Sequence, residues 1–78
     1  MLKDLLDRIA VNPRVMAGKP VIRGTRITVD LILKLLAAGM KPEEIAEDYK
    51  ISVEDVRAAL LYAAKILGYE EVLIVSEA

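Results

Sequence analysis

The sequence contains no cysteine, no histidine, no tryptophan and no phenylalanine. Without cysteine the chain forms no disulfide and no thiolate metal site, and without histidine it lacks the commonest metal ligand and acid–base group. Glu43, Glu47 and Asp48 could bind a hard cation, but a solvated acidic helix surface is the commoner explanation. A glycine loop with phosphate-binding spacing is also missing. We therefore expect a protein that is not an enzyme and that uses no metal, cofactor or small-molecule substrate.

Long apolar runs are lacking too. The longest uncharged apolar run, "AALLYAA", covers residues 58–64, whereas a membrane-spanning helix needs about 20 residues. Asp4 and Asp7 interrupt the apolar positions at the N-terminus, which argues against a signal peptide. We expect a cytoplasmic protein that does not enter a membrane.

Apolar residues, in contrast, are abundant. They make up 55% of 78 residues, a length that suits one domain near the lower limit for a self-sufficient core. With tyrosine as the only aromatic residue, the core must be built from leucine, isoleucine, valine and alanine. Such a small domain leaves apolar side chains at its surface, and a homodimer would bury them.

The net charge of −1 conceals a strong asymmetry. Residues 1–34 hold seven basic and three acidic residues, whereas residues 35–78 hold four basic and nine acidic ones. The stretch "GKPVIRGTRITV", residues 18–29, has three cations and no acid. This polarity predicts either a surface for an anion or a basic face that meets an acidic neighbour.

The N-terminal third alternates short apolar runs with turn residues. Leucines at helical spacing predict a short helix over residues 2–7. β-Branched residues separated by "NP", "GKP" and "RG" then predict short strands at 9–11, 21–22 and 26–28. Gly24 is expected to adopt a positive φ in the turn between the last two.

The remainder reads as three helices with good end signals. The expected caps are Thr28 and Ser52 at helix starts, Ser52 forming a capping box with Asp55. Gly39 and Gly68 are expected to end helices, and Pro42 fits a first helical position. The last helix should bury a stripe at steps of four, three and four residues, which comprises Val56, Leu60, Ala63 and Leu67.

The stretch "PEEIAEDYKISVEDVRAAL" has the spacing of a helix-turn-helix. Lys50 occupies the turn position that often holds glycine, so we expect a left-handed lysine there. The second helix would present Glu54 and Asp55 to DNA, with Arg57 as its only nearby cation. Because carboxylates repel phosphates, this helix is a poor DNA reader. A packing or dimer surface, a groove-binding helix and a protein-partner surface all remain open.

The motifs "GKPVIRGTRITV", "LLAAGMKPEEIAEDY" and "VRAALLYAA" resemble the prokaryotic DUF433 family, a domain of unknown function grouped with helix-turn-helix and antitoxin-like proteins. The resemblance covers roughly residues 9–64. It implies a mainly α fold with short N-terminal β-strands and a winged-helix-like or homeodomain-like helix core. It also implies a homodimeric antitoxin of a type II toxin–antitoxin pair, which neutralises a PIN-like ribonuclease toxin and binds its own promoter. The alternatives are a stand-alone DNA-binding regulator and a purely structural dimeric interaction module.

We expect nucleic acid or a protein partner to contact the basic loops and one cation of the last helix: Arg14, Lys19, Arg23, Gly24, Thr25, Arg26 and Arg57. On the functional interpretation the Gly24 backbone approaches a phosphate and the Thr25 hydroxyl donates to it. On the structural interpretation Arg23 and Arg26 instead pair with acids such as Glu43, Glu47 and Asp48, or with acids of a partner.

The sequence divides into a helix-turn-helix-type domain over residues 1–68 and a strand-like extension over residues 69–78. In the extension, "EVLIVS" (residues 71–76) predicts a strand that pairs with another strand, most simply across a dimer. The expected dimer interface comprises Leu61, Tyr62, Val72, Leu73, Ile74 and Val75.

Overall fold

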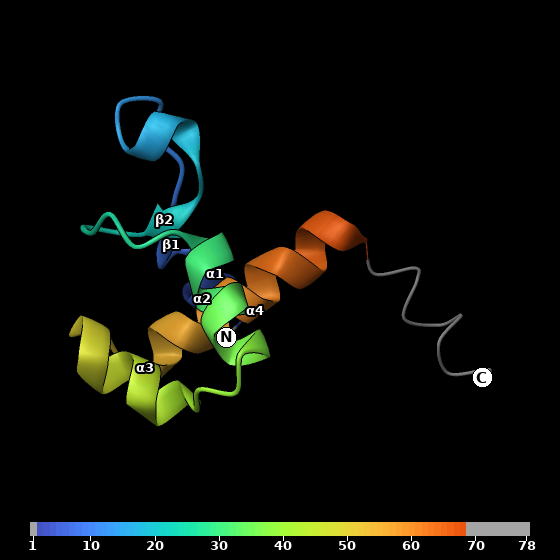
Figure 1. Ribbon diagram of the computed structural model, residues 1–78. Helices are drawn as coiled ribbons and strands as arrows, with labels where there is room; N and C mark the ends of the chain where they lie inside the picture. The colour runs from blue at the N-terminus through green and yellow to red at the C-terminus, as the bar shows by residue number, and fades with distance from the viewer. Residues whose placement is uncertain (1, 69–78) are drawn as a thin grey trace.

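The computed structural model describes residues 2–68, which form four α-helices, a two-stranded sheet and a short 3₁₀ turn (Figure 1). In chain order the elements are α1 (Leu2–Leu6), β1 (Ile9–Ala10), η1 (Met16–Gly18), β2 (Val21–Ile22), α2 (Val29–Ala37), α3 (Pro42–Tyr49) and α4 (Val53–Leu67). The predicted fold class, mainly helical with short N-terminal strands, is confirmed. Over residues 2–68, none of the helices has the length and apolar character needed to span a bilayer.

The sheet is a single antiparallel pair. Ile9 lies opposite Ile22 and Ala10 opposite Val21, and the loop between the two strands projects away from the helices (Figure 1). The predicted third strand at 26–28 is wrong, because only an isolated bridge joins Thr28 to Val21. Thr28 is also the N-cap of α2, so the chain leaves the sheet after one pairing.

The predicted N-caps are confirmed. The Thr28 hydroxyl accepts a hydrogen bond from the Leu31 N–H at 3.2 Å. Ser52 and Asp55 form the reciprocal capping box, in which the Asp55 N–H donates to the Ser52 hydroxyl at 3.1 Å and the Ser52 N–H donates to Asp55 Oδ2 at 3.0 Å. Each bond satisfies a backbone donor that the first helical turn leaves unpaired.

The end of α2 also follows its sequence. Gly39 has φ +103°, its N–H donates to the Leu36 carbonyl at 3.0 Å, and the Met40 N–H donates to the Leu35 carbonyl at 3.1 Å. These two bonds define a Schellman motif, which requires the left-handed conformation that glycine adopts without strain.

Only three residues join α3 to α4, which gives the expected helix-turn-helix. Lys50 adopts the left-handed conformation, with φ 60° and ψ 42°, at a cost of about 1–2 kcal/mol for a residue with a side chain. The Ile51 N–H donates to the Ala46 carbonyl at 3.0 Å and closes the turn.

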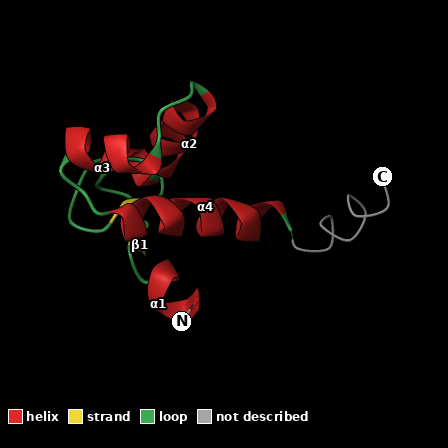
Figure 2. Cartoon of the chain, turned by 90° about the horizontal axis from the view of Figure 1, so that it is seen from below, coloured by secondary structure: helices red, strands yellow, loops and turns green. Residues whose placement is uncertain are grey.

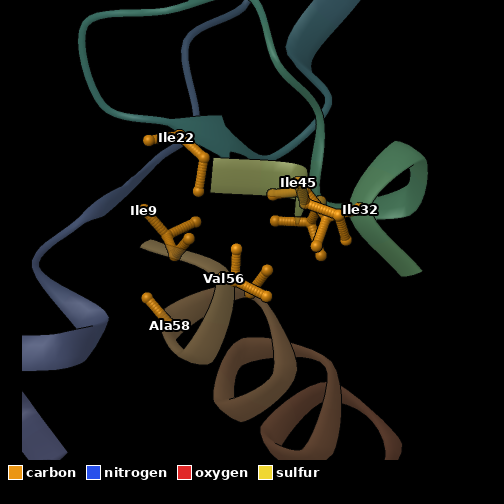
Figure 3. Close-up of a cluster of buried hydrophobic side chains, with 8 residues drawn as sticks. Ile9, Ile22, Ile32, Ile45, Val56 and Ala58 are labelled. Carbon is orange, nitrogen blue, oxygen red and sulfur yellow. The ribbon is translucent and has the colours of Figure 1, made fainter. Parts of the chain in front are cut away.

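Helix α4 is the central support of the fold. Figure 2 shows α2 and α3 on one side of α4 and α1 on the other, and all three helices contact it. Figure 3 shows the core where these elements meet. Its buried members are Ile9, Ile22, Val29, Ile32, Ile45, Val56, Ala58 and Ala59.

The predicted buried stripe of α4 is partly wrong. Val56 is fully buried, but Leu60 is 45% exposed and Leu67 is 77% exposed. Helices pack on two sides of α4, so the adjacent Ala58 and Ala59 are both covered and Leu60 is left at an open edge. The stripe that faces the core therefore runs through Val56 and Ala59, at a step of three rather than four.

Candidate functional site

Arg23, directly after β2, binds backbone carbonyls of the N-terminal segment. Its Nε donates to the Asp7 carbonyl at 2.7 Å and its Nη2 to the Ile9 carbonyl at 3.2 Å, while its own N–H donates to the Arg8 carbonyl at 2.8 Å. The guanidinium thus fastens the link between α1 and β1 to the hairpin. A contact from this side chain to an outside ligand would compete with these bonds.

Two further cations of the basic segment, residues 8–28, also have partners within the chain. Arg8 Nη1 lies 3.0 Å from Asp55 Oδ1 and donates to the Ser52 hydroxyl at 3.3 Å, so it binds the capping box of α4. Lys19 Nζ lies 3.6 Å from Asp30 Oδ2 in the first turn of α2. Both pairs connect the basic segment to helices. The Lys19–Asp30 pair is exposed and contributes little stability, whereas the Asp55 side chain of the other pair is only 14% exposed.

Among the acids of residues 2–68, Asp30 is the one whose pKa the fold clearly shifts. The Thr28 hydroxyl is the main cause of a lowered Asp30 pKa. Desolvation opposes it, and the nearby ammonium groups of Lys19 and Lys34 and the Leu31 N–H lower the pKa further. Lys34 Nζ lies 3.9 Å from Asp30 Oδ2. The carboxylate is thus favoured in its charged form at the start of α2.

Arg14 and Arg26 differ from the other cations of the segment. Over residues 2–68 no acidic side chain lies within ion-pair distance of either guanidinium. The expected pairing of Arg23 or Arg26 with Glu43, Glu47 or Asp48 is therefore wrong within one chain. Helix α3 is not the electrostatic partner of the hairpin.

In the turn between β2 and α2, the Thr25 side chain makes its hydrogen bonds to backbone groups of the turn itself. The Thr25 hydroxyl donates to the Ile22 carbonyl at 2.8 Å and accepts from the Ile27 N–H at 3.0 Å. A phosphate contact from this hydroxyl would have to replace its bond to Ile22. Gly24 has φ +82°, and a Cβ there would meet no atom within 4 Å, so its requirement for glycine comes from backbone conformation rather than crowding.

A surface groove of about 740 Å³ lies between the hairpin and the end of α3, and we name it the basic groove. It holds the cations Arg26 and Lys50 beside the half-buried Tyr49. Its other lining residues are Ala10, Asn12, Val15, Val21, Gly24, Thr25 and Ile27. Asn12, Tyr49 and Lys50 could not be recognised from the sequence as members of one site, because no local pattern links three positions so far apart in the chain.

An acidic surface occupies α3 and the first turn of α4, and we name it the acidic helix surface. It comprises five exposed residues: Glu43, Glu44, Glu47, Asp48 and Glu54. Arg57 is also exposed on α4, one turn after Glu54. Described residues provide no group of three or more acidic side chains arranged to hold a metal ion.

The residues expected at a dimer interface have different positions. Tyr62 is half-buried and packs against the core of its own chain, and Leu61 is also half-buried. Val72, Leu73, Ile74 and Val75 lie outside the described residues. A second groove, of about 360 Å³, lies beside Tyr62 at the C-terminal end of α4, and we name it the apolar groove.

Comparison with known proteins gives relatives of this domain whose names describe no function. An uncharacterised protein of Mycobacterium tuberculosis, Rv2308, is 30% identical over 57 residues, which is 73% of this chain and 24% of the relative. An uncharacterised protein of Archaeoglobus fulgidus is 50% identical over 30 residues, 38% of this chain and 83% of the relative. The chain thus spans about a quarter of Rv2308 but most of the archaeal protein.

Solved structures share the fold. The crystal structure of a DUF433 member protein from Anabaena variabilis matches with a TM-score of 0.72 at 28% identity, over 91% of this chain and 69% of that one. The crystal structure of Rv2018 from Mycobacterium tuberculosis matches with a TM-score of 0.64 at 30% identity, over 76% of this chain and 27% of that one. A family model described as protein of unknown function (DUF433) matches residues 9–63, which include the hairpin, the basic groove and most of α4. The chain therefore belongs to the DUF433 family.

Proposed function

We propose that this protein is an antitoxin of a type II toxin–antitoxin pair, which neutralises a PIN-like ribonuclease by covering its RNA-binding surface with the acidic helix surface. The observation that carries the proposal is the concentration of exposed acids on α3 and the start of α4, where a DNA-reading helix-turn-helix would need cations. A ribonuclease binds a polyanion, so the surface around its active site is basic. The acidic helix surface has the complementary charge for that surface.

Electrostatic complementarity of this kind acts mainly on the association rate and is screened by salt. Two of these acids, Glu47 and Asp48, have no ion-pair partner within residues 2–68, so they are available to pair with basic residues of the ribonuclease. Inhibition should therefore weaken as ionic strength rises.

Inhibition of RNA cleavage by a PIN-like ribonuclease encoded beside this protein tests the proposal. The double variant Glu47→Gln/Asp48→Asn should inhibit at least about tenfold more weakly at low salt, which corresponds to about 1.4 kcal/mol. The matched control Asp4→Asn/Asp7→Asn removes two exposed acids from the region of α1 and should inhibit normally. Equal inhibition by the two variants would exclude the acidic helix surface as the inhibitory site.

A second candidate function is binding of promoter DNA, and the basic groove favours it. Arg26 and Lys50 lie there without an acidic partner within residues 2–68, and Tyr49 adds an aromatic wall. The substitutions Arg26→Glu and Lys50→Glu should abolish retardation of the promoter fragment at low salt, whereas Glu54→Ala should leave it unchanged or strengthen it. The opposite ranking would move the DNA contact to α4.

We also propose that the protein acts as a homodimer, with Leu60 and Leu61 on α4 at its centre. Leu60 is 45% exposed on a helix that otherwise supports the core. Sedimentation equilibrium at micromolar concentration should give twice the chain mass of 8.6 kDa. A single 8.6 kDa species under these conditions would refute the dimer.

A further inference from the structure

The face of α4 that builds the core continues beyond the elements that cover it. Val56, Ala59, Ala63 and Ile66 follow one another at steps of three, four and three, which keeps them on one face of a helix. Their exposure rises along the helix, from 0% at Val56 to 66% at Ile66. Figure 1 shows why, since the C-terminal part of α4 extends past the other helices.

The apolar groove lies at the point where this face loses its cover. Tyr62, Ala63 and Ile66 form one wall, and Leu33 of α2 and Pro20 contribute to the other. Lys19 and Asp30, which pair at 3.6 Å, also line it. The groove therefore continues the hydrophobic core towards the end of α4 and has one charged border.

The chain itself supplies a segment of matching chemistry directly after this groove. Residues 69–78 follow Gly68, and they contain the four consecutive apolar residues 72–75. Glu70 and Glu71 precede this run in the sequence and Glu77 follows it, so acids flank the apolar run on both sides and complement the charge of Lys19 at the groove border.

The distances permit the segment to return to the groove. The groove occupies α4 from Tyr62 to Leu67, a rise of roughly 8 Å at about 1.5 Å per residue. The four steps along the chain from Gly68 to residue 72 can span roughly 13 Å at about 3.3 Å per residue. Gly68 has φ +96°, a conformation that glycine adopts without strain and that ends the helix before the segment begins.

We propose that residues 72–75 of the same chain fill the apolar groove and complete the core at the end of α4. A tethered segment acts at an effective concentration on the order of millimolar. At micromolar protein concentration this favours the chain's own segment over the segment of a second copy. The inference is independent of antitoxin activity, because it concerns how the domain covers its own apolar surface.

Hydrogen exchange of the full-length protein tests the proposal with a matched pair of substitutions. Ile66 and Val11 are both exposed apolar residues, but only Ile66 lines the groove. Ile66→Asp should accelerate exchange of the amides of residues 71–76 at least about tenfold, whereas Val11→Asp should leave their exchange unchanged. Exchange at the unprotected rate in the unsubstituted protein, or equal acceleration by both substitutions, would overturn the proposal.

Disulfide trapping identifies whether residues 72–75 of the same chain or of a second copy fill the groove. The sequence has no native cysteine, so only the introduced thiols can form a disulfide. Lys19→Cys combined with Val75→Cys should form an intramolecular disulfide under mild oxidation. The control pair Glu47→Cys with Val75→Cys should not, because α3 lies far from the C-terminal end of α4 in Figures 1 and 2. A predominant intermolecular disulfide in the Lys19→Cys variant, or equal trapping in the control, would refute the intramolecular arrangement.

Discussion

Two regions of this small domain concentrate charge of opposite sign, and they use it differently. In the basic segment, residues 8–28, three of five cations bind the chain itself: Arg23 binds backbone carbonyls, and Arg8 and Lys19 bind carboxylates. In the acidic helix surface, Glu43, Glu47, Asp48 and Glu54 make no ion pair within residues 2–68. The density of charge along the sequence therefore does not measure how much charge is available to a partner.

The difference follows from the backbone that each region contains. The hairpin and its turns leave carbonyls without sheet or helix partners, and arginine donors satisfy some of them. Helices α3 and α4 satisfy their own interior backbone groups, so their side chains stay free apart from the caps. Three cations of the irregular segment therefore bind groups of their own chain, whereas the acids of the acidic helix surface remain exposed and without ion pairs within residues 2–68.

The largest expected effect sharpens this contrast within α3 itself. Ile45 is fully buried in the core, whereas Glu47 is exposed on the same helix. Ile45→Ala should lower the free energy of unfolding by about 2–5 kcal/mol, because it leaves a cavity. Glu47→Gln should change it by no more than about 0.5 kcal/mol. Chemical denaturation measures both, and a large loss with Glu47→Gln would show that the acidic surface is structural.

The next effect compares two arginines three residues apart. Arg23→Ala removes two hydrogen bonds to the carbonyls of Asp7 and Ile9 and should cost about 1–3 kcal/mol of unfolding free energy. Arg26→Ala removes an exposed guanidinium with no acidic partner within residues 2–68 and should cost no more than about 0.5 kcal/mol. Equal losses of unfolding free energy in urea denaturation would mean that Arg23 and Arg26 do not differ in how they bind their own chain.

These two arginines also show what the sequence could reveal. Features governed by neighbouring residues were predictable: the Thr28 cap, the Ser52–Asp55 capping box and the left-handed Lys50 are all confirmed. The partners of Arg23 lie 14 and 16 residues away, and nothing in the sequence distinguishes it from Arg26.

The face that α4 presents to the core was predicted only in part for a related reason. A step of four from Val56 reaches Leu60 and a step of three reaches Ala59, and both are apolar. The packing of α1 against the opposite side of α4 decides between them, and this is a property of the tertiary structure. The basic groove was likewise unpredictable as a unit, because Asn12, Arg26 and Lys50 come from separate elements.

A smaller effect concerns Asp55, the acid of the helix pair that does bind the basic segment. Its two oxygens accept from the Ser52 N–H and from Arg8. Asp55→Ala should lower the free energy of unfolding by about 1–2 kcal/mol, most of it through loss of the cap. Glu54→Ala, at the neighbouring exposed position, should stay within about 0.5 kcal/mol. Thermal and chemical denaturation should agree on this ranking, and its reversal would refute the assigned cap.

The smallest effect is the pH dependence contributed by Asp30, which ties the basic segment to α2 through Lys19. Its pKa in the folded protein is lowered, chiefly by the Thr28 hydroxyl and then by Lys19 and Lys34. A carboxyl with a lower pKa in the folded than in the unfolded state stabilises the fold when ionised, so its contribution is complete above the unfolded pKa of about 3.9. As the pH falls below that value and through the folded pKa, the contribution is lost.

Unfolding free energies measured from about pH 5 down to about pH 2 should therefore fall less steeply for Asp30→Asn than for the unsubstituted protein. The difference between the two curves should be constant above about pH 5 and should shrink only at more acidic values. Because the hydroxyl of Thr28 is the main cause, most of this difference should survive in high salt, which screens the two exposed lysines. Parallel curves over the whole range would show that Asp30 makes no pH-dependent contribution, and complete loss of the difference in salt would assign it to the lysines instead.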